Sequence, residues 1–483
     1  MLKYMIYILW ILIFSSLTFL IITSKVSYSI KDLTITKKTA NHINIEKENY
    51  ANADYVNIEN VNDVKIENLD KATNHTFIVN VTLENVGMKK YLEAKYSEFD
   101  IVYNEYVKKH NRIVAELLNP SSNLSELPKV VVVIPDMKTG YGNRLPGIVC
   151  GFLYSLITDR LFFIWGYNNF EDYYEKDFNH NWNVVINLYK NTTYRYMHYL
   201  NQYNDFQLVT RGNLSNEDIS SHDILYVYTW DYACAPITSN PHYKKWFDKI
   251  IPDYKVFTTI SLKLLRLHPN INKQIETFAE KNFSNYAIGI HLREKKLLDG
   301  MIIPVGHYSE VVNMLIIGMK NMNISIFVAA DSNNGRTKLI NSLRKAFNHH
   351  NNNSINIVYT EENLDSVNPV SLNPGSEVGA LIDMKLLSLC DDLVITYSSS
   401  FGFIAAGWSQ KASRQRGPFV IMPVKDLDSD LWLVDKIWMW GAMSSEPCMY
   451  LSKELIENED EETVKTFKTN PLWMHFSQCH WYA

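Results

Sequence analysis

The sequence predicts an α/β protein with two successive parallel-sheet units, preceded by an apolar segment and a polar spacer. Short β-branched runs alternate with amphipathic helical stretches from Pro128 onward, and the alternation starts again near residue 286. A hydrophobic content of 46% supports large packed cores and excludes wholesale disorder. The net charge of −5 excludes a dominant nucleic-acid-binding surface, which needs a basic excess.

The N-terminal part divides into an apolar and a polar segment. Tyr4 to Thr23 is an uninterrupted uncharged run, and about 20 helical residues span the roughly 30 Å of a bilayer core. The run is longer than the apolar part of a cleaved signal peptide, so we expect an uncleaved anchor within residues 1–25. The lysines after it favour a cytosolic body. Residues 26–126 are polar and predict a spacer, helical in part at Tyr91–Leu118.

The remaining chain predicts two α/β units, at residues 127–285 and 286–483. The first opens with a strand at 129–135, a helix at 147–161 and a strand at 161–165. In the second we expect strands at 286–292, 324–329, 355–359 and 393–396. Helices are expected between and after them at 308–319, 336–347, 377–390 and 401–408.

Loops that follow predicted strands are the candidate ligand sites, because doubly wound sheets bind ligands there. In the first such loop, Gly140 and Gly142 allow a tight turn and close approach to a ligand. Asn143 and Arg144 follow, and Arg144 stands at the start of a helix, where oxyanions are favoured. An ordinary tight turn without a ligand is the alternative.

The second loop carries His291 and Arg293, which are two residues apart at a strand end and share one face. An arginine there can clamp a diphosphate through bidentate hydrogen bonds. The alternatives are a structural salt bridge for Arg293 and a structural role for His291.

The third loop precedes a predicted helix and contains Ser399, Ser400, Phe401 and Gly402. Small hydroxyl residues and a glycine at a helix N-terminus expose backbone N–H groups that can hold a phosphate. A serine cap without any ligand is the alternative. Together the three loops indicate a nucleotide or nucleotide-sugar site.

Motifs for several other chemistries are absent. The sequence has no CxxC, HExxH, Walker A or GxSxG motif. Asp428-Ser429-Asp430 has the DxD spacing of metal-dependent glycosyltransferases but lies in a polar stretch, and we interpret it as chance. No metal site is predicted.

The order of the motifs resembles that of the plant-type α-1,2-fucosyltransferases, over roughly three quarters of the chain from Lys129 onward. Gly142-Asn143-Arg144-Leu145 is similar to the family's GLGNR, and Ile288-Gly289-Ile290-His291-Leu292-Arg293 to its GIQIR, with histidine in place of glutamine. That histidine also suits the HxR motif of the wider superfamily. Further similar segments are 151–160, 170–178, 264–269, 380–402 and 442–448, the last close to the family's AMSMEPC.

The resemblance implies a GT-B fold with two Rossmann-like domains and the active site in the cleft between them. It implies GDP-fucose as donor, inversion at the fucose anomeric carbon, no metal requirement and a galactose-containing glycan acceptor. It also implies type II topology with the body in the Golgi lumen, which overrides the weak charge argument from the lysines.

Residue roles follow from the same resemblance. Breaking the glycosyl–phosphate bond builds negative charge on the β-phosphate, and we expect Arg293 to neutralise it. Backbone N–H groups at Ser399–Gly402 and the side chain of Arg144 are expected to assist. Asp331 is expected to contact guanosine. Asp383 is expected to support the donor site, or else to cap or pair within its helix.

The general base that activates the acceptor hydroxyl stays open. Asp299, Glu294 and His291 lie at or just beyond the strand end and are the candidates. Two other functions also stay open. One is an α-1,6- or protein O-fucosyltransferase of the same superfamily, and the other is an inactive, membrane-tethered glycan-binding homologue.

The chain has five cysteines, and the expected lumenal location permits disulfides between them. The resemblance implies a Cys448–Cys479 pair, since the family also carries cysteines in its C-terminal segment. Cys150 and Cys390 are expected as buried thiols on apolar helix faces. Cys234 has no predicted role.

Overall fold

The computed structural model describes most of the chain after residue 96. The described residues are 97–121, 126–167, 169–198, 203–229, 232–294, 303–317, 319, 321–347, 354–360, 374–409, 417–425, 432–442, 444–447, 461 and 464–465. The chain forms two compact units, Met1–Lys95 and Tyr96–Ala483, and the described residues belong to the second. The predicted anchor at Tyr4–Thr23 therefore lies outside them. Within the described ranges, no helix has the length and apolarity needed to cross a bilayer.

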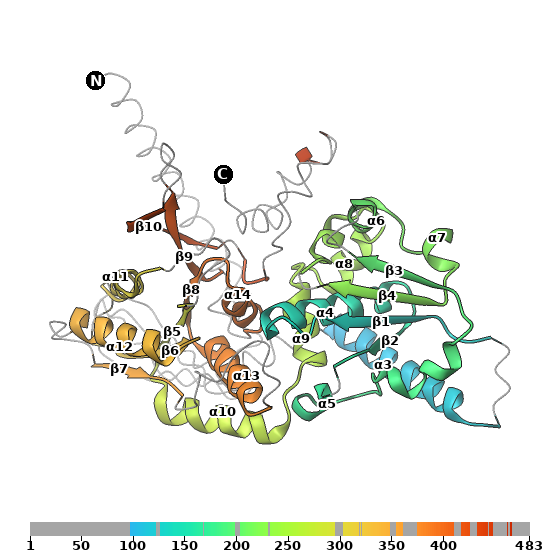
Figure 1. Ribbon diagram of the computed structural model, residues 1–483, viewed down its shortest axis with the longest axis horizontal. Coiled ribbons are helices and arrows are strands. Elements are labelled where there is room, and N and C mark those ends of the chain that lie inside the picture. Colours follow the sequence, from blue (N-terminus) through green and yellow to red (C-terminus); the bar gives the residue numbers. More distant parts are fainter. Residues whose placement is uncertain are drawn as a thin grey trace, which may run out of the picture. The chain divides into compact units, whose positions relative to one another are not determined.

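The first α/β unit contains a parallel sheet with strand order β2-β1-β4-β3 (Figure 1, right). Its strands are β1 (Val130–Pro135), β2 (Leu161–Ile164), β3 (Tyr194–His198) and β4 (Ile224–Thr229). The helix α4 (Tyr141–Ile157) connects β1 to β2, as the sequence predicts for a βαβ unit. It starts six residues earlier than expected from residue 147, so the glycine loop lies within its first turn. The other elements are α5 (Phe170–Tyr173), η1 (Trp182–Val184), η2 (Ile186–Tyr189), α6 (Tyr203–Arg211), α7 (Glu217–Ser220), η3 (Ala235–Ser239), α8 (Lys244–Ile250) and α9 (Val256–Leu264).

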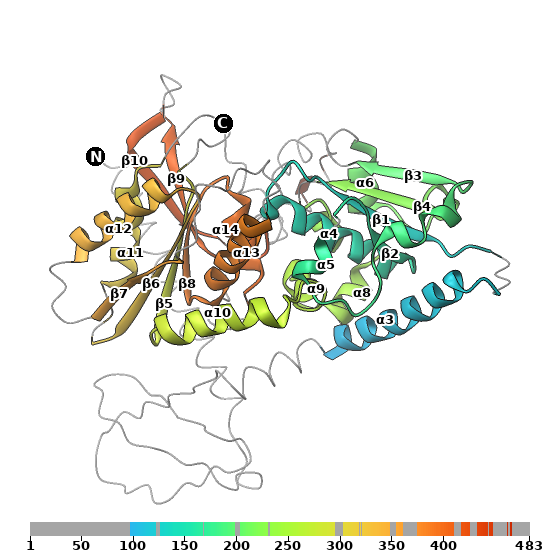
Figure 2. The same cartoon turned by 60° about the horizontal axis from the view of Figure 1, so that its bottom comes forward.

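The second unit contains a sheet with strand order β10-β9-β8-β5-β6-β7. Its strands are β5 (Tyr286–Leu292), β6 (Asn323–Ala330), β7 (Ser354–Val358), β8 (Asp392–Thr396), β9 (Phe419–Lys425) and β10 (Trp432–Gly441). All neighbours pair in parallel except β10, which is antiparallel to β9. The helices are α10 (Pro269–Asn282), α11 (Val305–Ile316), α12 (Asn333–Phe347), α13 (Pro374–Leu389) and α14 (Ser400–Gly407). In Figure 2, α10 runs beside α13, with which it is in contact.

The helix α3 (Ser97–Leu118) corrects the expected extent of the spacer. Its residues Phe99, Tyr103 and Tyr106 are buried, and the rings of Tyr103 and Tyr106 pack on Phe152 of α4. Burying three aromatic side chains stabilises a packed position by several kcal/mol, on the order of 1.5–3 each. The compact unit therefore begins at Tyr96, and α3 belongs to it rather than to a spacer ending at residue 126.

The cysteines also differ from the prediction. Cys150 of α4 is bonded to Cys234, which lies 84 residues further along the chain and had no predicted partner. Cys390 is a buried free thiol, as expected. The predicted Cys448–Cys479 pair lies outside the described residues. The apolar position of Cys150 on α4 indicated burial correctly, but burial alone does not distinguish a thiol from a disulfide.

Candidate functional site

The N-termini of α4 and α14 meet at the carboxyl ends of the two sheets, which brings the first and third predicted loops together. A Cβ on Gly142 would lie 2.3 Å from Ser400 Oγ and 2.7 Å from the backbone nitrogen of Phe401. The hydroxyl of Ser400 donates a hydrogen bond of 2.5 Å to Asn143 Oδ1. Gly142 thus allows a backbone approach that any side chain would block.

The start of α14 has no side-chain cap. Ser399 occupies the N-cap position but its side chain makes no capping hydrogen bond. Ser398 before it has a left-handed backbone with φ +57°, which turns the chain sharply out of β8. The first N–H groups of a helix have no partner within the helix and carry a partial positive charge. This end of α14 is therefore suited to an anion.

His291 lies against this helix end. Its ring stacks on Phe401 with 5.0 Å between ring centroids, and a Cβ on Gly402 would lie 3.1 Å from His291 Nδ1. The residue is 4% exposed, and Nδ1 has no hydrogen-bond partner among the residues that the structure describes. Burial, together with the charge of Arg293, lowers the pKa of His291 to about 3. The imidazole is therefore neutral at physiological pH and is a weak base.

Arg293 follows β5, and its backbone N–H donates to Thr396 Oγ1 at 2.9 Å. Its guanidinium forms an ion pair with Asp331 Oδ2 at 3.3 Å and is 37% exposed. Asp331 also accepts a hydrogen bond of 2.7 Å from the backbone of Glu294 through Oδ1. The predicted alternative of a salt bridge is thus present, yet the side chain remains accessible to an incoming anion.

Glu294 is the best described of the candidate bases. Its carboxylate accepts hydrogen bonds from Ser332, Asn334 and Lys338. Burial raises the pKa of Glu294, while the hydrogen bonds from Ser332 and Lys338 lower it, and the net shift is downward. A carboxylate held in this way is a weak proton acceptor. Asp299, the third candidate, lies outside the described residues.

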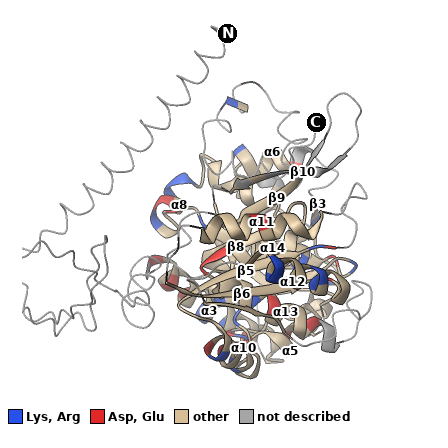
Figure 3. Ribbon diagram, turned by 90° about the vertical axis from the view of Figure 1, so that its left-hand side faces the viewer, with Lys and Arg blue, Asp and Glu red and all other residues tan. Residues whose placement is uncertain are grey.

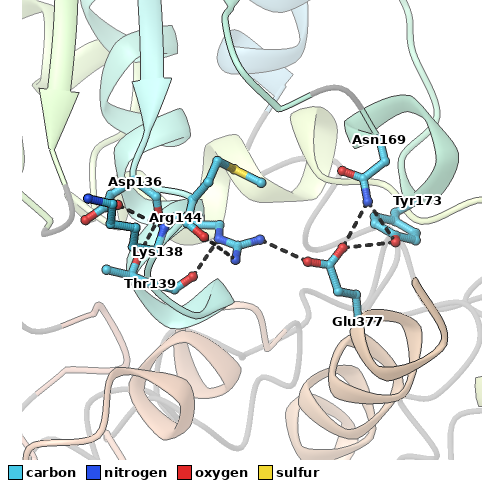
Figure 4. A network of polar contacts seen from close by, with 8 residues as sticks. Asp136, Lys138, Thr139, Arg144, Asn169, Tyr173 and Glu377 are labelled. Carbon is cyan, nitrogen blue, oxygen red and sulfur yellow. Dashed lines mark hydrogen bonds and ion pairs between the residues drawn. The ribbon is translucent and has the colours of Figure 1, made fainter. Parts of the chain in front are cut away.

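Arg144 lies in a polar network that joins the two α/β units (Figure 4). Its Nε donates to the carbonyl of Thr139 at 2.7 Å, and its Nη2 donates to the carbonyl of Met137 at 3.1 Å. Its Nη1 forms an ion pair with Glu377 of α13 at 3.1 Å, and only 4% of the Arg144 side chain is exposed. Each nitrogen of the guanidinium thus already has a partner.

Glu377 has further partners from α5 and the loop before it. Its Oε2 accepts hydrogen bonds of 3.0 Å from Asn169 Nδ2 and from the hydroxyl of Tyr173. The geometry supports a positioning role for Arg144 and Glu377, which hold the glycine loop and α13 in place. Sequence reasoning missed Glu377 because an acidic residue in the first turn of a helix is common.

Asp383 and the basic residues of α12 form a second polar group. Asp383 is buried and accepts a hydrogen bond of 2.7 Å from Thr360 Oγ1. The carbonyl of Thr360 accepts from Arg336 of α12 at 2.8 Å, and the Arg336 guanidinium lies 4.7 Å from the centre of the Tyr359 ring. Figure 3 shows the basic residues along α12. Asp383 therefore supports the loop after β7.

Glu446 anchors two distant parts of the chain to each other. It belongs to the motif-like segment 442–448, and the sequence predicts no role for it. Its carboxylate is buried and accepts hydrogen bonds from the backbone N–H groups of Phe257 and Thr258 at 2.8 and 3.1 Å. The hydroxyls of Tyr232 and Thr258 donate to it at 2.6 and 3.0 Å. Phe257 and Thr258 open α9, so Glu446 caps that helix from the C-terminal part of the chain.

The arrangement can bind an anion but shows no metal centre in the described residues. These ranges contain no group of three or more His, Cys, Asp or Glu that could hold an ion. The anion-binding features are the exposed guanidinium of Arg293, the N-terminus of α14 and the unpartnered Nδ1 of His291. All come from the carboxyl ends of β5 and β8, which are adjacent strands.

Comparisons with known proteins identify a solved structure with a similar fold. Neither the family models nor the curated proteins yield a match. Among solved structures, an arginine-to-lysine variant of Arabidopsis thaliana FUT1 in complex with GDP is similar, with a TM-score of 0.54 and 17% identity over 72% of this chain and 83% of that one.

Two other structures resemble the chain less closely. The NodZ α-1,6-fucosyltransferase soaked with GDP-fucose, known from Bradyrhizobium, has a TM-score of 0.41 and 15% identity over 65% of this chain and 99% of that one. POFUT1 in complex with GDP-fucose has a TM-score of 0.34 and 12% identity over 60% and 96%. The predicted α/β architecture is thus confirmed, and the chain has the Rossmann-like glycosyltransferase fold of the FUT1 structure.

Proposed function

We propose that the protein is an inverting fucosyltransferase that moves L-fucose from GDP-fucose to the O2 of a galactose in a glycan acceptor. The observation that carries this proposal is the anion-binding corner formed by Arg293, His291 and the start of α14. The FUT1 structure with a similar fold is a complex with GDP, which agrees with a nucleotide at such a corner.

Electrostatics at this corner suit a glycosyl–phosphate donor. Transfer breaks the bond between the fucose anomeric carbon and a β-phosphate oxygen, and negative charge grows on that phosphate. A partly exposed guanidinium and helix-terminal N–H groups stabilise this charge without reorganising. Neutral His291 adds a hydrogen-bonding nitrogen that is already desolvated and unpartnered. Asp331, paired with Arg293, orients the guanidinium and is proposed to contact guanosine.

Acceptor activation is proposed to use a base other than His291 or Glu294. The pKa of each is lowered, His291 by burial and Glu294 by its hydrogen bonds against the effect of burial. Asp299 remains the candidate by its position beyond β5. Metal-independent transfer and a Golgi location with type II topology, anchored by Tyr4–Thr23, complete the proposal.

Substituting Arg293 tests the proposal. One lost donor to the transition state costs about 2.7–4 kcal/mol, so Arg293→Ala is expected to lower kcat by about 10²–10³. The full chain is assayed for fucose transfer from GDP-fucose to lactose and to galactose-bearing polysaccharides. Arg344→Ala, which removes an exposed arginine of α12, is the matched control. Near-normal turnover by Arg293→Ala contradicts the assignment.

Product analysis separates the alternatives. An α-1,6-linked product, or transfer to a peptide hydroxyl, indicates another enzyme of the superfamily. GDP binding without transfer to any acceptor indicates an inactive glycan-binding homologue.

A further inference from the structure

One face of the first sheet carries a set of tyrosines that the proposed donor site does not use. Side chains alternate between the faces of a strand, so Tyr194 and Tyr196 of β3 share a face with Tyr226 and Tyr228 of β4. The register confirms this, because Tyr196 is paired with Tyr226. We call these four residues the tyrosine platform.

The platform is partly exposed and its rings are in mutual contact. Tyr194 is 58% exposed and Tyr196 is 49% exposed. The rings of Tyr196 and Tyr226 are stacked, with centroids 5.0 Å apart and planes 20° apart. Tyr194 contacts the rings of both Tyr196 and Tyr226 edge-on. Tyr226 itself is buried beneath them, so the outer rings rest on a firm base.

The exposure is unusual for a parallel sheet, which normally has both faces covered. Over β1 and β2 the same face is covered by Val114 and Leu117 of α3 and by Trp182 and Val185. Over β3 the cover ends, and among the described residues two large aromatic side chains stand open on the edge strand. Large exposed apolar groups that lie together mark a binding surface.

The charge of the tyrosine platform indicates which kinds of ligand it can bind. Arg195, between the two exposed tyrosines, lies on the opposite face of β3 and is paired with fully buried Asp205 at 2.9 Å. All four platform side chains are phenols, a neutral type of side chain, and burial raises the pKa of Tyr226. An uncharged aromatic surface gives no recognition of phosphates or acidic peptides. It suits a neutral ligand with apolar faces and hydroxyl edges.

The platform is continuous with the loop that holds Arg144. Tyr228 is paired with Ile134, two residues before Asp136 at the carboxyl end of β1. Tyr228 and the next residue, Thr229, pair with Ile134 and Pro135, the last two residues of β1 before that loop. The next residues, Met137 and Thr139, accept the hydrogen bonds of Arg144. A ligand lying along β3 and β4 therefore points toward the carboxyl ends of the strands.

We propose that the tyrosine platform binds a neutral polysaccharide, the acceptor glycan, by stacking its sugar rings on Tyr194 and Tyr196. This rests on the proposed function. The C–H face of a pyranose is apolar and packs on the negative face of an aromatic ring, while the phenol hydroxyls bond its hydroxyl edge. The rings of Tyr194 and Tyr196 have centroids 5.6 Å apart and planes 80° apart, so they offer successive sugars two ring surfaces of different orientation.

Binding and turnover are measured together on the full chain and on the Tyr194→Ala/Tyr196→Ala variant. Each aromatic contact contributes about 0.5–1.5 kcal/mol, so losing both is expected to weaken binding by about tenfold or more. Affinity electrophoresis in gels containing xyloglucan or arabinogalactan reports binding without transfer. Kinetics are expected to show a raised KM for the polymer, with kcat and the KM for lactose unchanged.

Controls separate stacking from loss of fold and from failure of the donor site. Tyr194→Phe/Tyr196→Phe keeps the rings and is expected to retain polymer binding, and Ile317→Ala removes a residue that is 72% exposed elsewhere. The affinity for GDP is measured separately and reports on the donor site. A wild-type chain that does not bind GDP contradicts the proposed function but not the tyrosine platform. The proposal is overturned if the wild-type chain binds neither polymer. It is also overturned if the Tyr194→Ala/Tyr196→Ala variant binds both polymers as tightly as the wild type does. Dimers that dissociate in the alanine variant also overturn it, since the face then joins two copies.

Discussion

His110 is expected to make the fold sensitive to acid. The ring is fully buried against Phe163 and Phe178, and its Nε2 is 3.0 Å from the carbonyl oxygen of Phe162. Within the described part of the chain, Nδ1 has no hydrogen-bond partner. Burial, and to a smaller extent the nearby His180, lower the pKa of His110 to about 4, against the raising effect of the Phe162 carbonyl. The unfolded chain has the ordinary value of about 6.5.

The sign and size of the effect follow from linkage. Between pH values of about 6.5 and 4, His110 binds a proton in the unfolded chain but not in the folded chain. The free energy of unfolding therefore falls as the pH falls. At about pH 5 the loss from this histidine is about 2 kcal/mol, and below about pH 4 it levels off near 3.4 kcal/mol. At about pH 7.5 it is close to zero. Buried His291, whose pKa is lowered to about 3, contributes in the same direction.

The variant His110→Phe isolates this contribution, because a phenyl ring keeps the packing and does not titrate. At about pH 7.5 it is expected to be less stable than the wild type by about 1 kcal/mol, since the carbonyl of Phe162 loses its partner. Between about pH 7.5 and 5 its stability should fall by about 2 kcal/mol less than that of the wild type. Urea unfolding of the full chain at both pH values measures the difference. Equal pH dependence in the two proteins would refute the reasoning.

Two further substitutions test the contacts that shape the site. Gly142→Ala is expected to lower GDP affinity and turnover by displacing the start of α14, whereas Gly140→Ala, whose Cβ meets nothing within 4 Å, is expected to change neither. Equal behaviour of the two variants in a GDP titration contradicts the close-approach argument. Glu446→Gln is expected to lower the free energy of unfolding by about 2–4 kcal/mol, because its amide NH₂ must face a backbone N–H of Phe257 or Thr258. A urea midpoint like that of the wild type contradicts the capping role.

Local periodicity predicted much of the second sheet. The predicted bounds of β5 match the observed Tyr286–Leu292, those of β6 and β7 differ by one residue at each end, and those of β8 differ by one residue at the start. β5, β6 and β8 lie inside the sheet and have mostly apolar runs, whereas the edge strand β7 alternates between polar and apolar residues. The apolar runs of β5 and β8 also predicted that His291 lies at the end of one strand and Ser399 just after the end of another. In the structure these two strands are adjacent and their loops are in contact.

Long-range partners could not be predicted in this way. Arg144 looked like a free cation at a helix start, but its partner Glu377 is 233 residues away. Neither residue carries a local signal of the other, because a hydrogen-bond partner leaves no periodic trace in the sequence. The same holds for Cys150 with Cys234, and for Glu446 with the first turn of α9.

These long-range contacts have a common consequence for the proposed chemistry. Arg144 with Glu377, and Glu446 with Phe257, each join a segment before β5 to a segment after it. They tie the two α/β units together near the carboxyl ends of the sheets, while the side chain of Arg293 stays 37% exposed and the start of α14 has no side-chain cap. Three of the five N–H donors of Arg144 bond to protein groups and its side chain is 4% exposed, whereas the side chain of Arg293 is 37% exposed. Arg293, rather than Arg144, is therefore the residue whose loss should lower kcat with the fold intact.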